Sequence, residues 1–261
     1  MTGVGIFSGQ VCTDTIKRKV VTMLKTNRYI LALALALSLG SCDGRRVSLV
    51  ERAAHHVAGS PFYVNAEVYK TSAFQPPPAP GSEAQKADLA AVLDWQQKRT
   101  QQDCARSQAT ADADYDFFWG DKPLFPSPLP PEVKKFFKHL DFDAGEAIHN
   151  MKNRYARLRP FKGYPAEVLP CIKKSKSYSY PSGHASYSRI FAGVLGDIAP
   201  ARREEFIKSA DEMAADRVVG GVHYPTDIAA AKVFGDEFHS QLLKSPAYLK
   251  DVERMKELLL K

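Results

Sequence analysis

Two short stretches of the sequence bring histidine, arginine and aspartate close to signals for helix starts. The first is Ser179-Tyr180-Pro181-Ser182-Gly183-His184, and the second runs from Arg217 to Asp227. Ser182 is a favourable N-cap residue, and Gly183 lets a ligand approach the backbone closely. A helix beginning there would point free N–H groups and the positive end of its dipole at an anion. His184 would lie in the first turn, beside that anion.

The second stretch combines a histidine with a carboxylate. His223 and Asp227 are four residues apart and share one face if Pro225 opens a helix. A carboxylate at that spacing fixes the imidazole tautomer and leaves the other ring nitrogen available for attack. Arg217 adds a cation six residues before His223.

Farther upstream, six residues separate Lys152 from Arg159-Pro160. Together with Arg217 these residues supply three cations for one anion. Phosphoryl transfer without a metal ion needs such cations, a helix N-terminus and a histidine backed by a carboxylate. By itself Lys152 would be a solvated surface lysine, and we interpret the neighbouring Arg154 and Arg157 as surface charges.

These three groups resemble the three-part signature of the type 2 phosphatidic acid phosphatase and vanadium haloperoxidase superfamily. The matching segments are Lys152-x6-Arg159-Pro160, Pro181-Ser182-Gly183-His184 and Arg217-x5-His223-x3-Asp227, in the order of that family. The soluble branch, the bacterial class A non-specific acid phosphatases, is most similar, because it shares the Ser-Tyr-Pro-Ser-Gly-His form and a segment like Pro76–Ser82. The resemblance covers roughly Phe74 to Lys232.

The resemblance implies a role for each site residue. His223 would attack phosphorus and become a phosphohistidine, Asp227 would orient it, and His184 would protonate the leaving oxygen and later activate water. The phosphate oxygens would be held by the remaining motif residues, which are Lys152, Arg159, Ser182, Gly183 and Arg217. No cofactor is expected, and no metal, because the histidines and acids have no ligand-like grouping.

One position departs from the family pattern. The third motif of the family usually begins Ser-Arg, whereas this chain has Asp216-Arg217. The family serine is expected to touch the phosphate, and an aspartate there would repel it. Asp216 therefore either points away, paired with a cation, or weakens phosphate binding.

The chain carries a net charge of +7, but much of it is near the start. Five basic residues and Asp14 precede Cys42, so the remainder carries only +3. This balance argues against nucleic acid as a partner. The expected partners are small phosphomonoesters, and a homodimer is a further expectation.

Residues 1–42 are predicted to be a signal peptide. Lys25 and Arg28 precede an apolar run from Tyr29 to Leu39, which is too short for a comfortable membrane span. The run ends in Leu39-Gly40-Ser41-Cys42, which resembles the lipobox of bacterial lipoproteins and implies lipidation of Cys42 and a membrane tether. Ordinary cleavage nearby is the alternative. Either reading predicts a periplasmic or cell-envelope protein, with residues 43–261 as the acid phosphatase domain.

Two cysteines remain after Cys42, namely Cys104 and Cys171. An oxidising compartment permits a disulfide between them, and two buried free thiols are an equal alternative.

The helical signals predict a single all-α domain, a helical bundle with its site at helix ends. One helix is expected from Ser82 to about Gln108, then a helix opened by Pro131, and another over about Asp143 to Arg157. Further helices are expected after Ser182, from Pro200 to Gly220, from Pro225 to about Leu243, and over Ala247 to Leu260. The aromatic segment near Trp119 could overhang a pocket, or equally could fill an edge of the core.

Three alternatives to a phosphomonoesterase stay open. The same pocket could hold vanadate in a haloperoxidase, although the chain is short for that branch. A membrane-tethered enzyme could act on lipid phosphates. A chain without catalytic activity could bind phosphate or a partner, and Asp216 is the sequence feature that favours this reading.

Overall fold

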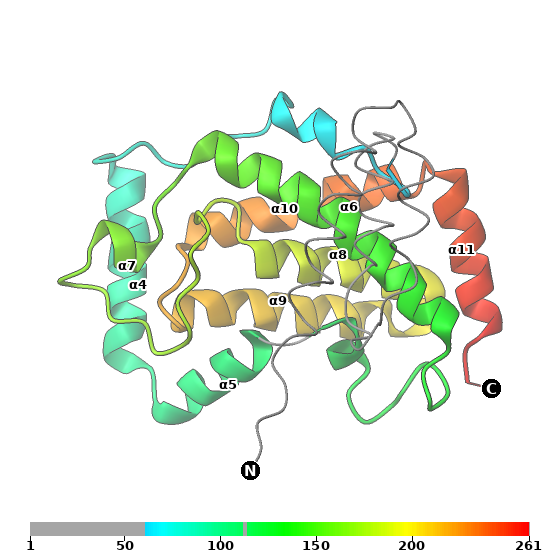
Figure 1. Ribbon diagram of the computed structural model, residues 1–261. Coiled ribbons are helices and arrows are strands. Elements are labelled where there is room, and N and C mark those ends of the chain that lie inside the picture. Colours follow the sequence, from blue (N-terminus) through cyan, green and yellow to red (C-terminus); the bar gives the residue numbers. More distant parts are fainter. Residues whose placement is uncertain (1–60, 112–113, 261) are drawn as a thin grey trace, which may run out of the picture. The chain divides into compact units, whose positions relative to one another are not determined.

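The structure is a computed structural model, and it describes residues 61–111 and 114–260. Over these residues the chain is helical and contains no strand, so the predicted all-α fold is confirmed (Figure 1). The predicted signal peptide and Cys42 lie outside the described residues. No helix among the described residues is long and apolar enough to cross a bilayer.

Helix α8 (Gly183–Ile198) is the central helix of the bundle. It packs along α9 (Arg203–Val219) and α10 (Pro225–Leu242), and it also contacts α6 (Pro131–Tyr155) and α11 (Pro246–Glu257) (Figure 1). Most of its side chains are buried, and many of them are small. Small residues let neighbouring helices approach closely, so the first turn of α8 is held on several sides.

Close packing leaves no room at Gly193 in the middle of α8. A Cβ atom added there would lie 2.9 Å from Cγ of His239 on α10. His239 is in turn fixed by Asp197, whose Oδ2 lies 2.7 Å from its Nε2. Asp197 is in the last turn of α8, at the opposite end of that helix from Ser182. The pair therefore belongs to the scaffold.

The single helix expected from Ser82 to about Gln108 is in fact two helices, α4 (Glu83–Lys98) and α5 (Gln101–Ala111). The break is caused by a reciprocal cap, because Thr100 N donates to Asp103 Oδ2 at 2.9 Å and Asp103 N donates to Thr100 Oγ1 at 3.1 Å. Arg99 is extended and its side chain donates to the carbonyls of Val219 and Leu169. Apolar residues recur at helical spacing on both sides of this break, so the sequence pattern did not reveal it.

The two helices expected on either side of Asp143 are instead one helix, α6. Asp143 does not cap a new helix; its carboxylate accepts the backbone N–H groups of Phe62, Tyr63 and Val64. Helix α6 ends at Tyr155, and Ala156 follows in the left-handed conformation with φ of 46°. The chain then reaches the extended Arg159 and the short helix α7 (Pro160–Gly163).

The other helices begin close to the expected residues. A 3₁₀ turn, η4 (Pro200–Arg202), precedes α9, and Ser245 caps α11. Two further 3₁₀ helices are η2 (Ala66–Lys70) and η3 (Tyr115–Trp119). In η3 the side chains of Phe118 and Trp119 are buried in the core, which favours the core-filling interpretation of the aromatic segment.

Two clusters of apolar side chains hold the bundle together. The larger one fills the space between α6, α8, α10 and α11. The smaller one lies where α8 and α10 begin, and it joins Val92, Phe161, Ile172, Ala185 and Val222, among others. Burying a side chain such as Phe or Val stabilises a fold by about 1.5–3 kcal/mol. The smaller cluster therefore supports the helix ends that carry the predicted site.

Candidate functional site

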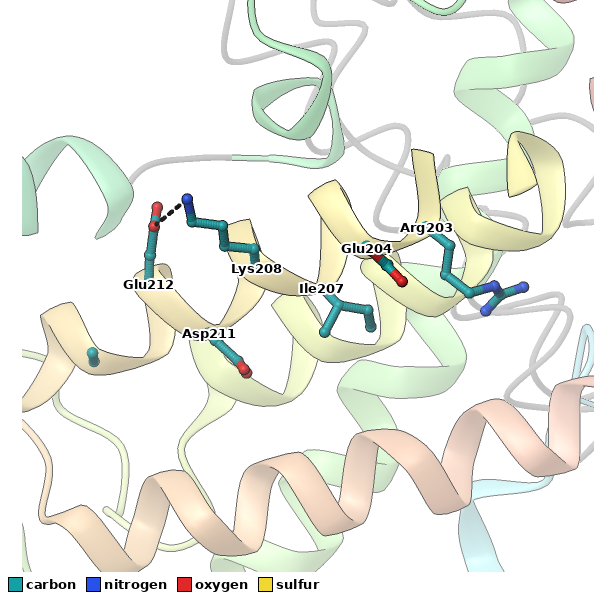
Figure 2. A pocket seen from close by; sticks show the side chains of 7 residues that line it. Arg203, Glu204, Ile207, Lys208, Asp211 and Glu212 are labelled. Carbon is teal, nitrogen blue, oxygen red and sulfur yellow. Dashed lines mark ion pairs between the residues drawn. The ribbon is translucent and has the colours of Figure 1, made fainter. Parts of the chain in front are cut away.

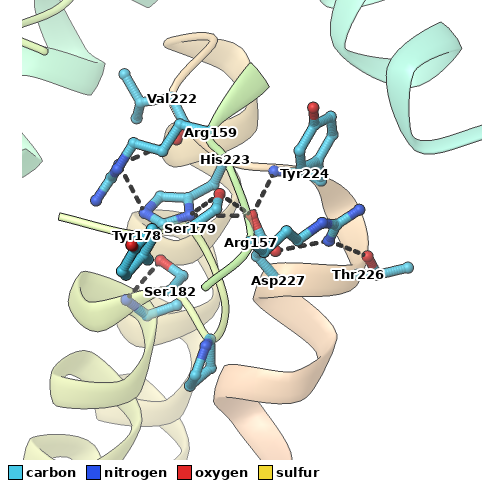
Figure 3. Close-up of polar contacts among 12 residues, drawn as sticks. Arg157, Arg159, Tyr178, Ser179, Ser182, Val222, His223, Tyr224, Thr226 and Asp227 are labelled. Carbon is cyan, nitrogen blue, oxygen red and sulfur yellow. Dashed lines mark hydrogen bonds and ion pairs between the residues drawn. The ribbon is translucent and has the colours of Figure 1, made fainter. Parts of the chain in front are cut away.

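The structure brings the three motif segments together at one end of the bundle (Figure 3). Helices α8 and α10 begin there, and α6 and α9 end there. The start of α8 is bonded directly to the first turn of α10, because Ser182 N donates to the carbonyl of Asp227 at 3.1 Å. Residues far apart in the sequence thus share one polar centre.

His223 and Asp227 form a fully buried pair, with exposures of 1% and 0%. Nδ1 of His223 lies 3.1 Å from Oδ2 of Asp227. The same oxygen accepts Ser179 Oγ at 2.5 Å and the N–H of Tyr224 at 2.9 Å. Burial alone would raise the pKa of Asp227, but these bonds and the nearby cations outweigh it and hold the pKa at about 2.

Arg159 determines which nitrogen of His223 carries the proton. NH1 of Arg159 lies 3.1 Å from Nε2 of His223, and a guanidinium can only donate. Nε2 must therefore present its lone pair, and Nδ1 must hold the hydrogen that points to Asp227. Burial lowers the pKa of His223 well below its usual value, and Arg159 lowers it further, while Asp227 opposes both. The imidazole is neutral, with a lone pair on Nε2.

Arg157 was interpreted from the sequence as a surface charge, and this interpretation is wrong. Its side chain is buried, with NH1 2.7 Å from Asp227 Oδ1 and NH2 2.6 Å from Asp88 Oδ2. Ser179 was also missed as a site residue, although its hydroxyl contacts both His223 and Asp227 (Figure 3). For Arg157, the only hint in the sequence was its position two residues before Arg159, after an amphipathic helix.

Lys152 lies at the end of α6 and is buried. Its ammonium donates to the carbonyls of Tyr178 at 2.6 Å and Pro181 at 2.8 Å, with Ser179 at 3.4 Å. Burial, and then Arg159, lower the pKa of Lys152 to about 7. In this structure Lys152 therefore shapes the loop that leads to Ser182.

Ser182 is the N-cap of α8, and its hydroxyl accepts the N–H of Ala185. Next to it, Gly183 faces Lys152 at ordinary van der Waals distance, since a Cβ atom added to Gly183 would lie 3.6 Å from Cε of Lys152. His184 keeps an accessible edge, and its Nε2 lies 2.7 Å from the carbonyl of Ala111 on α5. Partial desolvation, followed by the charge of Arg217, lowers the pKa of His184, while the Ala111 carbonyl opposes this shift.

Arg217, in the last turn of α9, is buried and points NH2 at the end of α5. NH2 donates to the carbonyl of Ser107 and, at 2.8 Å, to Thr110 Oγ1. Asp216 also reaches α5, where Arg106 Nε lies 3.0 Å from Oδ1 and Thr110 Oγ1 lies 3.0 Å from Oδ2. Of the two alternatives for Asp216, the structure thus has the carboxylate paired with a cation.

A disulfide fixes α5 to the segment that leads to the site. Cys104 on α5 and Cys171 are joined with an S–S distance of 2.09 Å. The carbonyl of Gly220 accepts the N–H of Cys171 at 3.2 Å, so the same segment also contacts the turn after α9. The disulfide thus holds the first turn of α5, while Arg217 and His184 contact its last turn at Thr110 and Ala111.

The turn between α9 and α10 depends on Gly221. Its φ is +76°, and a Cβ atom there would lie 3.2 Å from Cα of Pro170. A side chain at this position would be strained in conformation and crowded in space. The turn folds back so that Val222 N and His223 N both donate to the carbonyl of Arg217. Gly221 thus helps to set the position of His223.

A separate hollow of about 600 Å³ lies on the outer face of α9 (Figure 2). Several of its charged side chains pair with each other or with neighbours: Lys208 with Glu212 at 3.9 Å, and Asp211 with Lys232 at 2.8 Å. This pairing is typical of a solvated helix face. Among residues 61–111 and 114–260, no three His, Cys, Asp or Glu side chains are grouped so as to hold a metal ion.

Comparison with known proteins places this geometry in context. Residues 144–236 match the family model described as the PAP2 superfamily. A non-specific acid phosphatase of Providencia stuartii is 32% identical over 133 residues, which are 49% of this chain and 53% of that protein. The corresponding protein of Salmonella typhimurium is 30% identical with the same coverage. A lipid A 1-phosphatase of Rhizobium johnstonii is 32% identical over 98 residues, 36% of this chain and 40% of that protein.

The chain spans about half the length of the acid phosphatases that it matches. Among solved structures, a bacterial vanadium-dependent iodoperoxidase aligns with a TM-score of 0.53 and 16% identity over 69% of this chain and 53% of that one. At this identity the likeness concerns the fold, and it agrees with the predicted type of helical bundle.

Proposed function

We propose that this chain, which carries a PAP2 superfamily domain over residues 144–236, is an acid phosphatase that hydrolyses phosphomonoesters without a metal ion. The reaction proceeds through a phosphohistidine on His223. The similarity to non-specific acid phosphatases supports the class of reaction. The local geometry supports the residues and their roles.

The observation that carries the proposal is the tautomer of His223. Its Nδ1 hydrogen points to Asp227, and its Nε2 lone pair points toward the guanidinium of Arg159, 3.1 Å away. A nucleophile for phosphorus needs a free lone pair next to positive charge that can hold the phosphoryl oxygens. Asp227 then stabilises the imidazolium that forms when the Nε2–P bond is made.

Phosphate is held by side chains that donate to protein acceptors in this structure and that exchange some of these bonds for bonds to phosphate oxygens. Arg159 NH1 gives up its contact with Nε2 to a phosphoryl oxygen as phosphorus takes that place. The long contact of 3.4 Å between Lys152 and the Ser179 carbonyl is the one that a phosphate oxygen replaces most easily. Arg217 and the N-terminus of α8, at Gly183, complete the set of donors. Removal of one such donor costs about 2.7–4 kcal/mol of the barrier.

His184 transfers the protons. In the first step the Nε2–P bond of His223 forms, the bond from phosphorus to the ester oxygen breaks, and His184 gives its proton to that oxygen. In the second step His184 takes a proton from water, the water oxygen binds phosphorus, and the Nε2–P bond breaks. Phosphate leaves and both histidines return to their starting states. The accessible edge of His184 leaves room for a leaving group of varied size.

The test uses p-nitrophenyl phosphate with the purified full chain, in the presence of EDTA. Wild-type activity should survive EDTA, and His223→Ala should lose at least about a thousandfold, since it removes the nucleophile. Rapid quenching in alkali should preserve a phosphoramidate, which ³¹P NMR detects in the wild type and not in the variant. Activity that disappears with EDTA would replace this mechanism by one that uses a metal.

The chain offers a matched control for the histidine. His239 also pairs with a carboxylate, because its Nε2 lies 2.7 Å from Asp197 Oδ2. It stands in the last turn of α10, at the other end of that helix from the site. His239→Ala should keep the catalytic rate, even if the variant is less stable. Equal losses in His223→Ala and His239→Ala would mean that the loss reports stability and not chemistry.

We propose further that the protein works outside the cytoplasm, as the apolar run after Arg28 suggests. The disulfide between Cys104 and Cys171 supports this, because oxidising compartments are where such bonds persist. Lipidation of Cys42 would tether the enzyme to a membrane. Cys42→Ala should then move the protein from the membrane fraction to the soluble fraction, and an unchanged distribution would contradict the tether.

A further inference from the structure

The strongest feature that the mechanism does not use is a buried guanidinium behind the catalytic pair. Arg157 is 8% exposed, yet it contacts two carboxylates from different helices, and Figure 3 shows its contact with one of them, Asp227. NH1 lies 2.7 Å from Asp227 Oδ1, and NH2 lies 2.6 Å from Asp88 Oδ2 on α4. Because His223 contacts the other oxygen of Asp227, the four groups form one chain: carboxylate, guanidinium, carboxylate, imidazole.

The surroundings fix this chain in one geometry. The guanidinium carbon of Arg157 stacks 4.1 Å from the ring centroid of Tyr224, and NH2 also donates to Gln85 Oε1 at 2.6 Å. Thr226 bridges Arg157 and Asp88, since its hydroxyl accepts from Arg157 NH1 at 2.8 Å and donates to Asp88. The planar guanidinium donates to both carboxylates at once while it stacks on the ring; a lysine would keep the positive charge but not this double contact.

We propose that Arg157 and Asp88 are positioning residues that set the pH at which His223 becomes an unprotonated nucleophile. This inference rests on the proposed function and adds two residues to it. Arg157 neutralises part of the negative charge that Asp227 presents to the imidazole. Asp88 in turn draws Arg157 back and limits that neutralisation.

The remaining ionisable groups around His223 stay constant in this comparison. Arg159 before α7, Asp227 on α10 and Lys152 on α6 act on His223 directly. Tyr180 before α8 and Tyr224 before α10 interact with Asp227, while His184 on α8 and Arg217 on α9 interact with Arg159. Arg157 and Asp88 can be changed without altering this set, and neither is assigned a contact with phosphate. Their effect on His223 passes through Asp227.

The two positioning residues carry opposite charges, so their removal has opposite effects. Arg157→Gln removes a cation, leaves more negative charge beside His223 and stabilises the imidazolium. The proton should then leave His223 at a pH higher by about one unit. Asp88→Asn removes an anion, so the proton should leave at a lower pH, by about half a unit. Arg157→Lys keeps the charge and should restore most of the wild-type value.

The experiment measures the titration of His223 directly by NMR of histidine labelled with ¹⁵N and ¹³C, together with the pH dependence of kcat/KM. Asp197→Asn is the matched control, because Asp197 is a partly buried carboxylate that pairs with His239, Tyr248 and Arg203 far from the site. This control should lower stability without moving the titration of His223. Shifts of opposite sign in Arg157→Gln and Asp88→Asn would support the inference.

Shifts of the same sign, or titrations equal to that of Asp197→Asn, would overturn it and leave a purely structural role. If Arg157→Gln does not fold, a titration of His223 that moves to lower pH in Asp88→Asn but stays near the wild-type value in Arg157→Lys supports the inference, and an unmoved titration in Asp88→Asn overturns it. The NMR titration does not require turnover. A wild-type chain that fails to hydrolyse phosphomonoesters would therefore refute the proposed function, while the inference about Arg157 would still be tested by itself.

Discussion

The ion pair between Arg106 and Asp216 leads to a quantitative prediction. Asp216 is 1% exposed and stands next to Arg217, where an unpaired carboxylate would repel phosphate. Arg106 Nε lies 3.0 Å from Asp216 Oδ1 and masks that charge. We predict that Arg106→Ala both destabilises the fold and raises KM, and that Asp216→Ser in the Arg106→Ala background recovers much of both losses.

The size of the effect follows from the exposure of the two partners. Coulomb's law with an effective dielectric constant of about 20 gives about 5.5 kcal/mol for unit charges at 3.0 Å. The Arg106 side chain is 57% exposed, so solvent screens much of this energy, and the desolvation of Asp216 offsets another part. A net coupling of about 1–2 kcal/mol remains. We expect the unmasked carboxylate to repel phosphate with a free energy of similar size, which would raise KM about tenfold.

The assay is a double-mutant cycle by urea denaturation, with KM for p-nitrophenyl phosphate measured on the same four proteins. The pair of Arg254 and Glu132 is the control, since its atoms are 3.4 Å apart and both side chains are about half exposed. Its coupling should not exceed about 0.5 kcal/mol. A coupling between Arg106 and Asp216 as small as in this control, together with an unchanged KM in Arg106→Ala, would refute the reasoning.

Three further predictions concern the site and its support. With rising pH, kcat/KM should increase as His223 loses its proton and decrease as His184 loses its own. Because the pKa values of both histidines are lowered from 6.5, the maximum should lie below pH 6.5. A plateau that extends to about pH 8 would contradict this prediction. Gly221→Ala should lower the free energy of unfolding in urea by about 1–3 kcal/mol and lower kcat. Gly81→Ala, with φ of +80° and open space around it, should lose only the conformational part of that free energy. Equal losses would show that crowding at Gly221 is unimportant. Cys104→Ser opens a loop of 67 residues and should lower the free energy of unfolding by about 2–4 kcal/mol, and an unchanged midpoint in urea would contradict a stabilising disulfide.

Local signals in the sequence located the helix starts well. Ser82, Pro131, Ser182 and Pro225 all stand where the structure begins a helix or the residue before one, because capping oxygens and fixed φ angles act over a single turn. Boundaries without such strong signals were missed. The break at Thr100 depends on a Thr-x-x-Asp cap that an uninterrupted apolar period concealed.

The residues behind the site could not be predicted, because their partners are distant in sequence. In the sequence Arg157 looks like one more charge just after α6, and its partners Asp88 and Asp227 are 69 and 70 residues away. The partner of Asp216 is 110 residues away. Motif spacing predicts which residues meet at the candidate site, whereas the residues that hold them depend on tertiary packing.

The pairing of Asp216 also constrains how such a sequence can change over generations. An aspartate introduced beside Arg217 before an arginine stood at position 106 would be a buried, unpaired charge and would be selected against. The arginine, by contrast, is largely exposed and could arise first at little cost. Among relatives, an acidic residue at the position of Asp216 should therefore occur together with a basic residue at the position of Arg106, while chains with serine there should tolerate many residues at that second position.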